Sequence, residues 1–378
     1  DNGYIEYDYL CATTLVYFFL DLLCKTIKNK IKISDYLIYV VLATVCDVMP
    51  LRKLNRLIAL TTFKNFDIKK NIPINELFNL NKKKNKININ DLGYLIGPIL
   101  NAGGRLGKSK YATELLSSDN LDIINIRSIE LIKLNDKRKK IEKLILDEID
   151  FQILEKECKD VIFYYNPSIN EGLIGIIASR LKDYFNKPSI VITNSNKILK
   201  GSARSTYNYN IGRVIKKAVD KNIIIAGGGH NMAAGFMLKN NNLKNLEDFI
   251  LEDFSTTVIS KNYMFMYDAK VSSYAFNKDF YQDLKKLEPF GTNNPVPTFF
   301  FKDLRVIKNT ILDGKHISSI LKSKVGFSIK SISFDSVNSK IGEYLLNYKK
   351  DLNVLGQINE NFWNNKISLQ LTIRDIVL

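Results

Sequence analysis

The sequence predicts an α/β protein of several domains, and three patterns among its 378 residues carry this prediction. Short apolar runs alternate with helical patterns in the middle of the chain, which is typical of α/β domains. Residues 123–159 contain neither Gly nor Pro and have apolar side chains at near-helical spacing. After about residue 263 the pattern changes to short alternating runs. We therefore expect an α/β region, a long connecting helix, a second α/β domain and a small C-terminal β-barrel, in this order.

The first region, residues 1–122, alternates apolar helical stretches with loops, and its run 39–45 is typical of a buried strand that ends at Asp47. In α/β folds, side chains at the carboxyl ends of strands hold ligands and metals. Carboxylates suit Mg²⁺ and Mn²⁺, so Asp47 is a candidate metal ligand and catalytic residue. An aspartate that caps a helix is the alternative interpretation of the same residue.

A loop of small residues at 101–107 presents one arginine, Arg105, near the end of this region. A guanidinium in such a loop suits phosphate oxygens, whereas close packing of the backbone against a neighbour explains the small residues equally well. The next stretch, 123–159, predicts one long helix or two helices in line, roughly 55 Å long at about 1.5 Å per residue. We expect it to separate two domains.

The second domain, residues 160–258, is predicted to be α/β. We expect strands at 161–165, 189–193, 199–203 and 223–226, and helices near 175–184 and 211–219. The last strand runs into Gly227, Gly228, Gly229 and His230. Consecutive glycines allow positive φ angles and bring N–H groups close to an anion, with His230 as a donor at the tip. A tight turn with an exposed histidine is the alternative.

Ser202 and Arg204 stand two residues apart on a predicted strand of this domain. Side chains at this spacing share one face of a sheet, and a hydroxyl beside a guanidinium suits phosphate oxygens. The segment 171–180 predicts the start of a packed helix whose glycines allow close approach to the sheet. The sequence therefore indicates a phosphate site built from the Ser/Arg strand and the glycine run.

The last region, residues 259–378, predicts several short strands and a single helix around 279–287, which is typical of a Greek-key barrel of the OB type. The proline-rich segment 289–297 predicts a rigid loop that leads into a strand. Bases stack on aromatic side chains in OB folds, but aromatic residues in strands are more often part of the core. No individual stacking residue is assigned for this reason.

Composition favours a polyanionic partner, because 55 Lys and Arg against 39 Asp and Glu give a formal net charge of +16. A genome-wide bias toward Lys and Asn is the alternative source of this surplus. The four cysteines have no paired spacing, which fits a reduced cytoplasmic protein. The apolar runs 9–20 and 36–46 are shorter than the roughly 20 residues of a membrane span, so no membrane anchor is expected.

Six motifs stand in an order that carries a family resemblance: ATVCDVMPL (43–51), LNAGGRLG (100–107), IGIIASRL (174–181), GSARS (201–205), GGGHNMAAG (227–235) and EPFGTNNPVP (288–297). Together they resemble the RecJ family of single-stranded-DNA-specific exonucleases, in the DHH/DHHA1 phosphoesterase superfamily. The resemblance covers nearly the whole chain. It implies part of a DHH domain (1–122), the connecting helix (123–159), a DHHA1 domain (160–258) and an OB domain (259–378).

The resemblance implies a 5′→3′ hydrolase that removes nucleotides from single-stranded DNA with two Mn²⁺ or Mg²⁺ ions, in DNA repair and recombination. Asp47 matches the family's late aspartate ligand, and Arg105 matches the arginine of its small-residue loop. The positions that approach the substrate phosphates are matched by Ser202, Arg204, Gly227, Gly228, Gly229 and His230. The resemblance further implies single-stranded DNA, a single-strand-binding protein and a helicase as partners.

The chain departs from the family pattern at its start. The family's Asp-x-Asp pair and Asp-His-His triplet have no counterpart, because the two histidines are His230 and His316. We therefore expect little nuclease activity from this polypeptide alone, since one carboxylate cannot hold two divalent ions. A non-catalytic single-strand-binding protein is the second hypothesis. A phosphodiesterase for short oligonucleotides is the third, and the C-terminal barrel argues against it.

Overall fold

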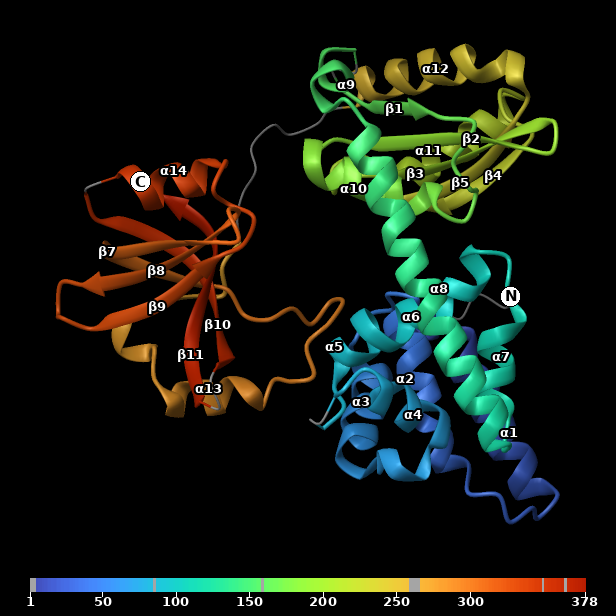
Figure 1. The fold of residues 1–378 in the computed structure, drawn as a ribbon, viewed down its shortest axis with the longest axis horizontal. Coiled ribbons are helices and arrows are strands. Elements are labelled where there is room, and N and C mark those ends of the chain that lie inside the picture. Colours follow the sequence, from blue (N-terminus) through green and yellow to red (C-terminus); the bar gives the residue numbers. More distant parts are fainter. Residues whose placement is uncertain (1–4, 84–85, 158–159, 258–265, 349, 364–365) are drawn as a thin grey trace. The chain divides into compact units, whose positions relative to one another are not determined.

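The structure is a computed structural model that describes residues 5–83, 86–157, 160–257, 266–348, 350–363 and 366–378 (Figure 1). Two compact units divide the chain. The first comprises Asp1–Phe66, Ile87–Leu92 and Met264–Leu378, and the second comprises Asp67–Lys86 and Gly93–Tyr263.

The first unit begins with three helices, α1 (Ala12–Thr26), α2 (Leu37–Cys46) and α3 (Lys53–Asn65), and includes the single turn α5 (Ile89–Asp91). The strand predicted at 39–45 is therefore wrong, because these residues lie inside α2. The run buries Val40, Val41 and Leu42 with little polar alternation, and a fully buried helix has the same signature as a buried strand. Within the described residues, no helix combines the length and the apolar character that a bilayer crossing requires.

The remainder of the first unit is a closed β-barrel, which confirms the predicted OB type (Figure 1, orange and red). Its strands run in the order β10-β11-β9-β8-β7-β6, and an additional β10–β7 pairing closes the ring. A core of apolar side chains from every barrel strand fills the interior. The elements are β6 (Ala269–Val271), α13 (Lys278–Lys285), β7 (Phe299–Leu312), β8 (His316–Ser323), β9 (Ser328–Ser333), α14 (Lys340–Asn347), β10 (Leu352–Trp363) and β11 (Lys366–Val377).

The second unit contains the helices α4 (Ile72–Leu80), α6 (Gly97–Arg105), α7 (Lys110–Ser117), α8 (Leu121–Glu148) and α9 (Phe151–Glu157). Helix α8 fills most of the stretch where a connecting helix was expected. The Asn120 side chain caps it by accepting hydrogen bonds from the N–H groups of Asp122 and Ile123. The extended backbone at Ile149 ends the helix, so that α9 follows as a separate element.

A five-stranded sheet forms the α/β part of the second unit, in the order β1-β2-β3-β5-β4. Helix α10 (Ile174–Phe185) packs on one face, and helices α11 (Ile211–Asp220) and α12 (Leu243–Thr256) pack on the other. The strands are β1 (Ile162–Tyr165), β2 (Ser189–Ser195), β3 (Ile198–Arg204), β4 (Ala226–His230) and β5 (Ala233–Leu238). The predicted strand at 223–226 is misplaced, because β4 begins at Ala226 and consists mainly of the glycines that follow.

Candidate phosphate-binding site

Ser202 and Arg204 lie side by side on strand β3, on the face of the sheet that α10 covers in part. Arg204 Nη1 donates hydrogen bonds to Ser202 Oγ at 3.1 Å and to the Ala203 carbonyl at 2.9 Å. Both acceptors are uncharged, so the positive charge of the guanidinium is not neutralised by these bonds. The pair presents a hydroxyl and a cation together, as the two-residue spacing on a strand requires.

The strands β5 and β4 extend this face beyond Arg204. Residues directly opposite each other in antiparallel strands point to the same side, so two rows of residues cross β3, β5 and β4. A Cβ atom at Gly228 would meet no atom within 4 Å, and one at Gly235 would meet only the Gly201 carbonyl oxygen at 3.9 Å. Beside the Ser/Arg pair, this face therefore exposes backbone that no side chain covers. We call this surface, formed by Gly228 and Gly235, the open floor. The first row consists of Ser202, Gly235 and Gly228, and the second row consists of Arg204, Ala233 and His230.

The glycine run is a strand and not the expected turn, and none of its three glycines has a positive φ. Gly227 and Gly229 face the opposite side of the sheet. A Cβ atom at Gly227 would lie 2.7 Å from the Ile215 side chain of α11, and one at Gly229 would clash with the Ala233 carbonyl oxygen. Two of the three glycines are thus required by close packing. Gly228 is the one that opens the face shared with Arg204.

Arg105 is the last residue of α6, and its Nη1 donates to the Gly172 carbonyl at 3.0 Å. Gly172 closely precedes the start of α10. Gly175, in the first turn of α10, lies against the Ser/Arg pair: a Cβ atom there would be 2.9 Å from Arg204 Nη2 and 3.1 Å from Ser202 Oγ. The structure thus brings Arg105, Ser202 and Arg204 to the amino-terminal end of α10. Sequence reasoning treated Gly172 and Gly175 only as packing residues and so missed their place beside the arginines.

The two guanidinium groups lie in a partly buried, strongly positive environment. Burial lowers the pKa of Arg204, and the charge of Arg105 lowers it further. Burial also lowers the pKa of Arg105, with a further lowering from Arg138 and an opposing effect from Glu142. Among the ion pairs of the described residues, neither Arg105 nor Arg204 has a carboxylate partner. Two desolvated cations that repel each other favour a bound anion, and a phosphate group offers the matching geometry.

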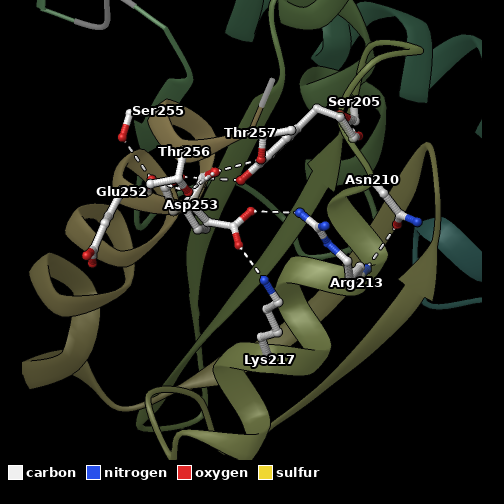
Figure 2. A network of polar contacts seen from close by, with 11 residues as sticks. Ser205, Asn210, Arg213, Lys217, Glu252, Asp253, Ser255, Thr256 and Thr257 are labelled. Atoms are coloured by element: carbon white, nitrogen blue, oxygen red, sulfur yellow. Dashed lines mark hydrogen bonds and ion pairs between the residues drawn. The ribbon is translucent and has the colours of Figure 1, made fainter. Parts of the chain in front are cut away.

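A polar network on the other face of the sheet joins α11 to α12 (Figure 2), and a bond of Asn210 extends it to the residue after β4. Asn210, which caps α11, accepts from the Arg213 N–H and donates to Asn231 Oδ1 at 2.7 Å, directly after β4. Asp253 of α12 accepts from Lys217 Nζ at 2.8 Å and from Arg213 Nη2 at 3.1 Å. These bonds link α12, α11 and the β4–β5 turn. The sequence carried no signal for this network, because its partners are distant along the chain.

Asp47 lies in the first unit and follows the last residue of α2. It is exposed, and it stands at the negative end of the helix dipole, where a carboxylate is unfavourable without a nearby cation. The strand end expected at this position is therefore the C-terminal end of a helix. The described residues contain no group of three or more His, Cys, Asp or Glu side chains placed to hold a metal ion. Asp47 alone does not fit a two-ion site, which needs several oxygen ligands.

Comparisons with known proteins agree with this architecture. Residues 159–256 match the DHHA1 domain, and residues 267–375 match the RecJ OB domain. The single-stranded-DNA-specific exonuclease RecJ of Haemophilus influenzae is 28% identical over 92% of this chain and 62% of its own length. The RecJ of Bacillus subtilis is also 28% identical, over 88% of this chain and 43% of its own length. The chain thus spans about two fifths to three fifths of the length of these relatives.

The fold is similar to that of a crystal structure of RecJ in complex with Mn²⁺ from Thermus thermophilus. The TM-score is 0.77 at 20% sequence identity, over 91% of this chain and 50% of that one. The Mg²⁺ complex from the same organism matches with a TM-score of 0.75 at 21% identity. The chain is therefore similar to RecJ over most of its length, and it contains a DHHA1 domain followed by a RecJ OB domain.

Proposed function

We propose that this chain supplies the phosphate-binding and strand-binding parts of a RecJ-type 5′→3′ exonuclease that hydrolyses single-stranded DNA in repair and recombination. The observation that carries the proposal is the pair of partly buried guanidiniums, Arg105 and Arg204, without a carboxylate partner among the described ion pairs. The pair stands beside an open floor of glycine backbone. The names of the similar relatives, which are single-stranded-DNA-specific exonucleases, support the same proposal.

In the proposed complex, Arg105 and Arg204 bind phosphate oxygens and Ser202 Oγ donates to another. Gly228 and Gly235 let the nucleotide backbone approach the sheet, because neither position has a side chain to exclude it. His230, at the end of the same row, is a further donor at the rim. The OB barrel and the net charge of +16 would hold the strand beyond this site through phosphate contacts.

Divalent metal ions belong to the proposed hydrolysis, because the similar RecJ structures are complexes with Mn²⁺ and Mg²⁺. The described residues do not supply the ligands of a two-metal centre, so no catalytic step is assigned to this chain. We propose Asp47 as its one contribution to metal binding. Proposed partners besides single-stranded DNA are a single-strand-binding protein and a helicase, and the proposed location is the cytoplasm.

A non-catalytic single-stranded nucleic-acid-binding protein is the second candidate function. The shortage of metal ligands among the described residues favours it. Incubation of the chain with 5′-phosphorylated single-stranded DNA and Mn²⁺ tests whether the chain hydrolyses DNA by itself. Sustained release of mononucleotides supports an enzyme that works as it stands. Binding without release supports either the second candidate or an enzyme that needs further metal ligands.

Fluorescence anisotropy with a labelled oligothymidylate tests the phosphate site directly. Arg204→Ala and Arg105→Ala should each weaken binding and reduce the slope of log K against log salt by about 0.7, the value for one phosphate contact on a single strand. Arg213→Ala is the matched control, because this arginine pairs with Asp253 on the opposite face of the sheet. A salt slope that stays the same in both site variants would contradict the proposal.

A further inference from the structure

A buried carboxylate joins two helices close to the proposed phosphate site. The Glu142 side chain of α8 is only 8% exposed, and it accepts from Arg138 Nη1 at 2.9 Å and from Arg180 Nε at 2.7 Å. Arg138 belongs to α8 and is 12% exposed, whereas Arg180 belongs to α10 and is 58% exposed. One negative charge thus lies between two positive charges, and the bond to Arg180 docks α10 on α8.

The burial of this group calls for an explanation other than stability. The free energy lost when two charges are removed from water is about as large as the free energy gained from their attraction. Proteins in which a buried ion pair is replaced by apolar residues are therefore often as stable as the parent. Elsewhere on α8 the protein keeps its charges nearer to water, since Arg127 and Glu130 are 26% and 37% exposed. The best attested reason to retain a buried ionic group is that it fixes one arrangement of the elements around it.

The element that Glu142 fixes through Arg180 is the helix that begins at the phosphate site. Gly175 of α10 lies against Arg204, and the Gly172 carbonyl just before α10 accepts from Arg105. Gly175 and Arg180 are separated by five residues, or about 7.5 Å along the helix axis. A shift of α10 relative to α8 would therefore move the contacts of both guanidiniums.

The same helix α8 also supports α6, which ends at Arg105. A Cβ atom at Gly103 would lie 3.2 Å from the Leu131 side chain, so α6 packs closely on α8 two residues before Arg105. The charges of Arg138 and Glu142 act on Arg105 in opposite directions, the first lowering and the second raising its pKa. The carboxylate thus offsets the repulsion that Arg138 exerts on Arg105.

We propose that Glu142 is a positioning residue for phosphate binding: it docks α10 on α8 through Arg180 and thereby holds Arg105 and Arg204 in their places. This inference rests on the proposed function, in which those two arginines contact the phosphates of single-stranded DNA. Glu142 itself touches no nucleotide. Its effect on binding passes through the arrangement of the two helices.

Glu142→Gln in the full chain tests the inference, because it removes the charge and keeps the shape. If Glu142 acted only as a negative charge near DNA, this variant would bind an oligothymidylate more tightly. If it positions the arginines, binding weakens, and we expect about a tenfold higher Kd, within the range of measured couplings between contacting residues. Glu130→Gln, on the same helix and paired with Arg127, is the matched control and should leave Kd within about twofold.

Arg180→Gln provides a second measurement, since its exposed side chain makes misfolding a small concern. If Glu142 acts through Arg180, the double variant Glu142→Gln/Arg180→Gln loses no more affinity than Glu142→Gln alone. Additive losses would instead mean that Arg180 contacts the strand independently, and this would overturn the inference. A Glu142→Gln variant that binds like Glu130→Gln would also overturn it. Failure of the proposed function is distinct, because then Arg105→Ala and Arg204→Ala would have no effect.

Discussion

Gly175 of helix α10 lies directly against Arg204 of strand β3, so that a Cβ atom at the glycine would stand 2.9 Å from Arg204 Nη2. Glycine is otherwise unfavourable inside a helix by about 1 kcal/mol relative to alanine. The absence of a side chain at this position is therefore explained by the guanidinium and hydroxyl packed beneath it. The start of α10 thus leaves room for Arg204 and Ser202, the two side chains proposed to bind phosphate.

Gly175→Ala should keep the fold and weaken DNA binding. The three atoms nearest to the new methyl group belong to the Arg204 and Ser202 side chains, so Arg204 swings away and the helix stays. We expect Kd for an oligothymidylate to rise about tenfold, equivalent to about 1.4 kcal/mol. Gly104→Ala in α6 is the control, because a Cβ atom there meets nothing within 4 Å. Equal Kd values for the two variants would contradict this account of Gly175.

The glycine run offers a prediction that separates packing from binding. Gly227→Ala places a methyl group 2.7 Å from the buried Ile215 side chain, and overpacking of this kind costs about 1–3 kcal/mol. Gly228→Ala meets only open space, so it should leave stability unchanged or raise it by about 0.4–1 kcal/mol.

For affinity to single-stranded DNA we expect the reverse: Gly228→Ala, which spares stability, should lose more affinity than Gly227→Ala. The methyl group of Gly228→Ala raises the floor where the nucleotide backbone would approach, so this variant should bind single-stranded DNA more weakly than the parent. Thermal unfolding and anisotropy on both variants check the two halves of the prediction. If Gly228→Ala retained full affinity, the open floor would have no part in binding.

The sequence predicted those parts of the site that follow from local periodicity. The two-residue spacing of Ser202 and Arg204 on a strand is enough to place both on one face, and their hydrogen bond shows the result. The glycine run was misread because consecutive glycines are far more common in turns than in strands. Here close packing and an open face require glycine for different reasons at neighbouring positions.

Other features of the site could not be predicted, because their partners are remote in the sequence. Glu142 and Arg180 stand 38 residues apart, and no pattern in either helix indicates that they meet. Helix α2 was misread as a strand for a related reason. A run that is buried on all sides loses the polar alternation from which its period could be recognised.

The backbone of Val48, directly after Asp47, is strained, so we predict that a substitution which relieves this strain stabilises the protein. Its φ of 56° is in the left-handed region, which costs a β-branched residue roughly 1–2 kcal/mol. The Met49 N–H bonds to the Thr44 carbonyl at 2.9 Å, so Val48 occupies the helix-ending position where glycine is usual. Val48→Gly should therefore stabilise the protein by about 1 kcal/mol, after allowance for the added freedom of the unfolded chain.

Urea denaturation measures this gain as a higher midpoint with an unchanged m value. Val45→Gly, inside α2, is the opposite control and should lower the midpoint by an amount equivalent to about 1 kcal/mol or more. Strain of this kind is concentrated at functional positions, and here it adjoins the candidate metal ligand. A midpoint that falls in Val48→Gly would show that the valine side chain contributes more by its contacts than its backbone costs.

Asp253→Asn tests whether the two faces of the sheet act independently. The Asp253 side chain is 9% exposed and accepts from both Arg213 and Lys217, so its loss leaves two cations unneutralised (Figure 2). Removing one partner of a buried pair costs about 3–5 kcal/mol, and the 47% exposure of each cation reduces this to about 1–3 kcal/mol here. Because the proposed phosphate site lies on the opposite face, Kd for single-stranded DNA should stay within about twofold at temperatures where the variant is folded. A large loss of affinity without a loss of stability would mean instead that the network positions His230 through the β4–β5 turn.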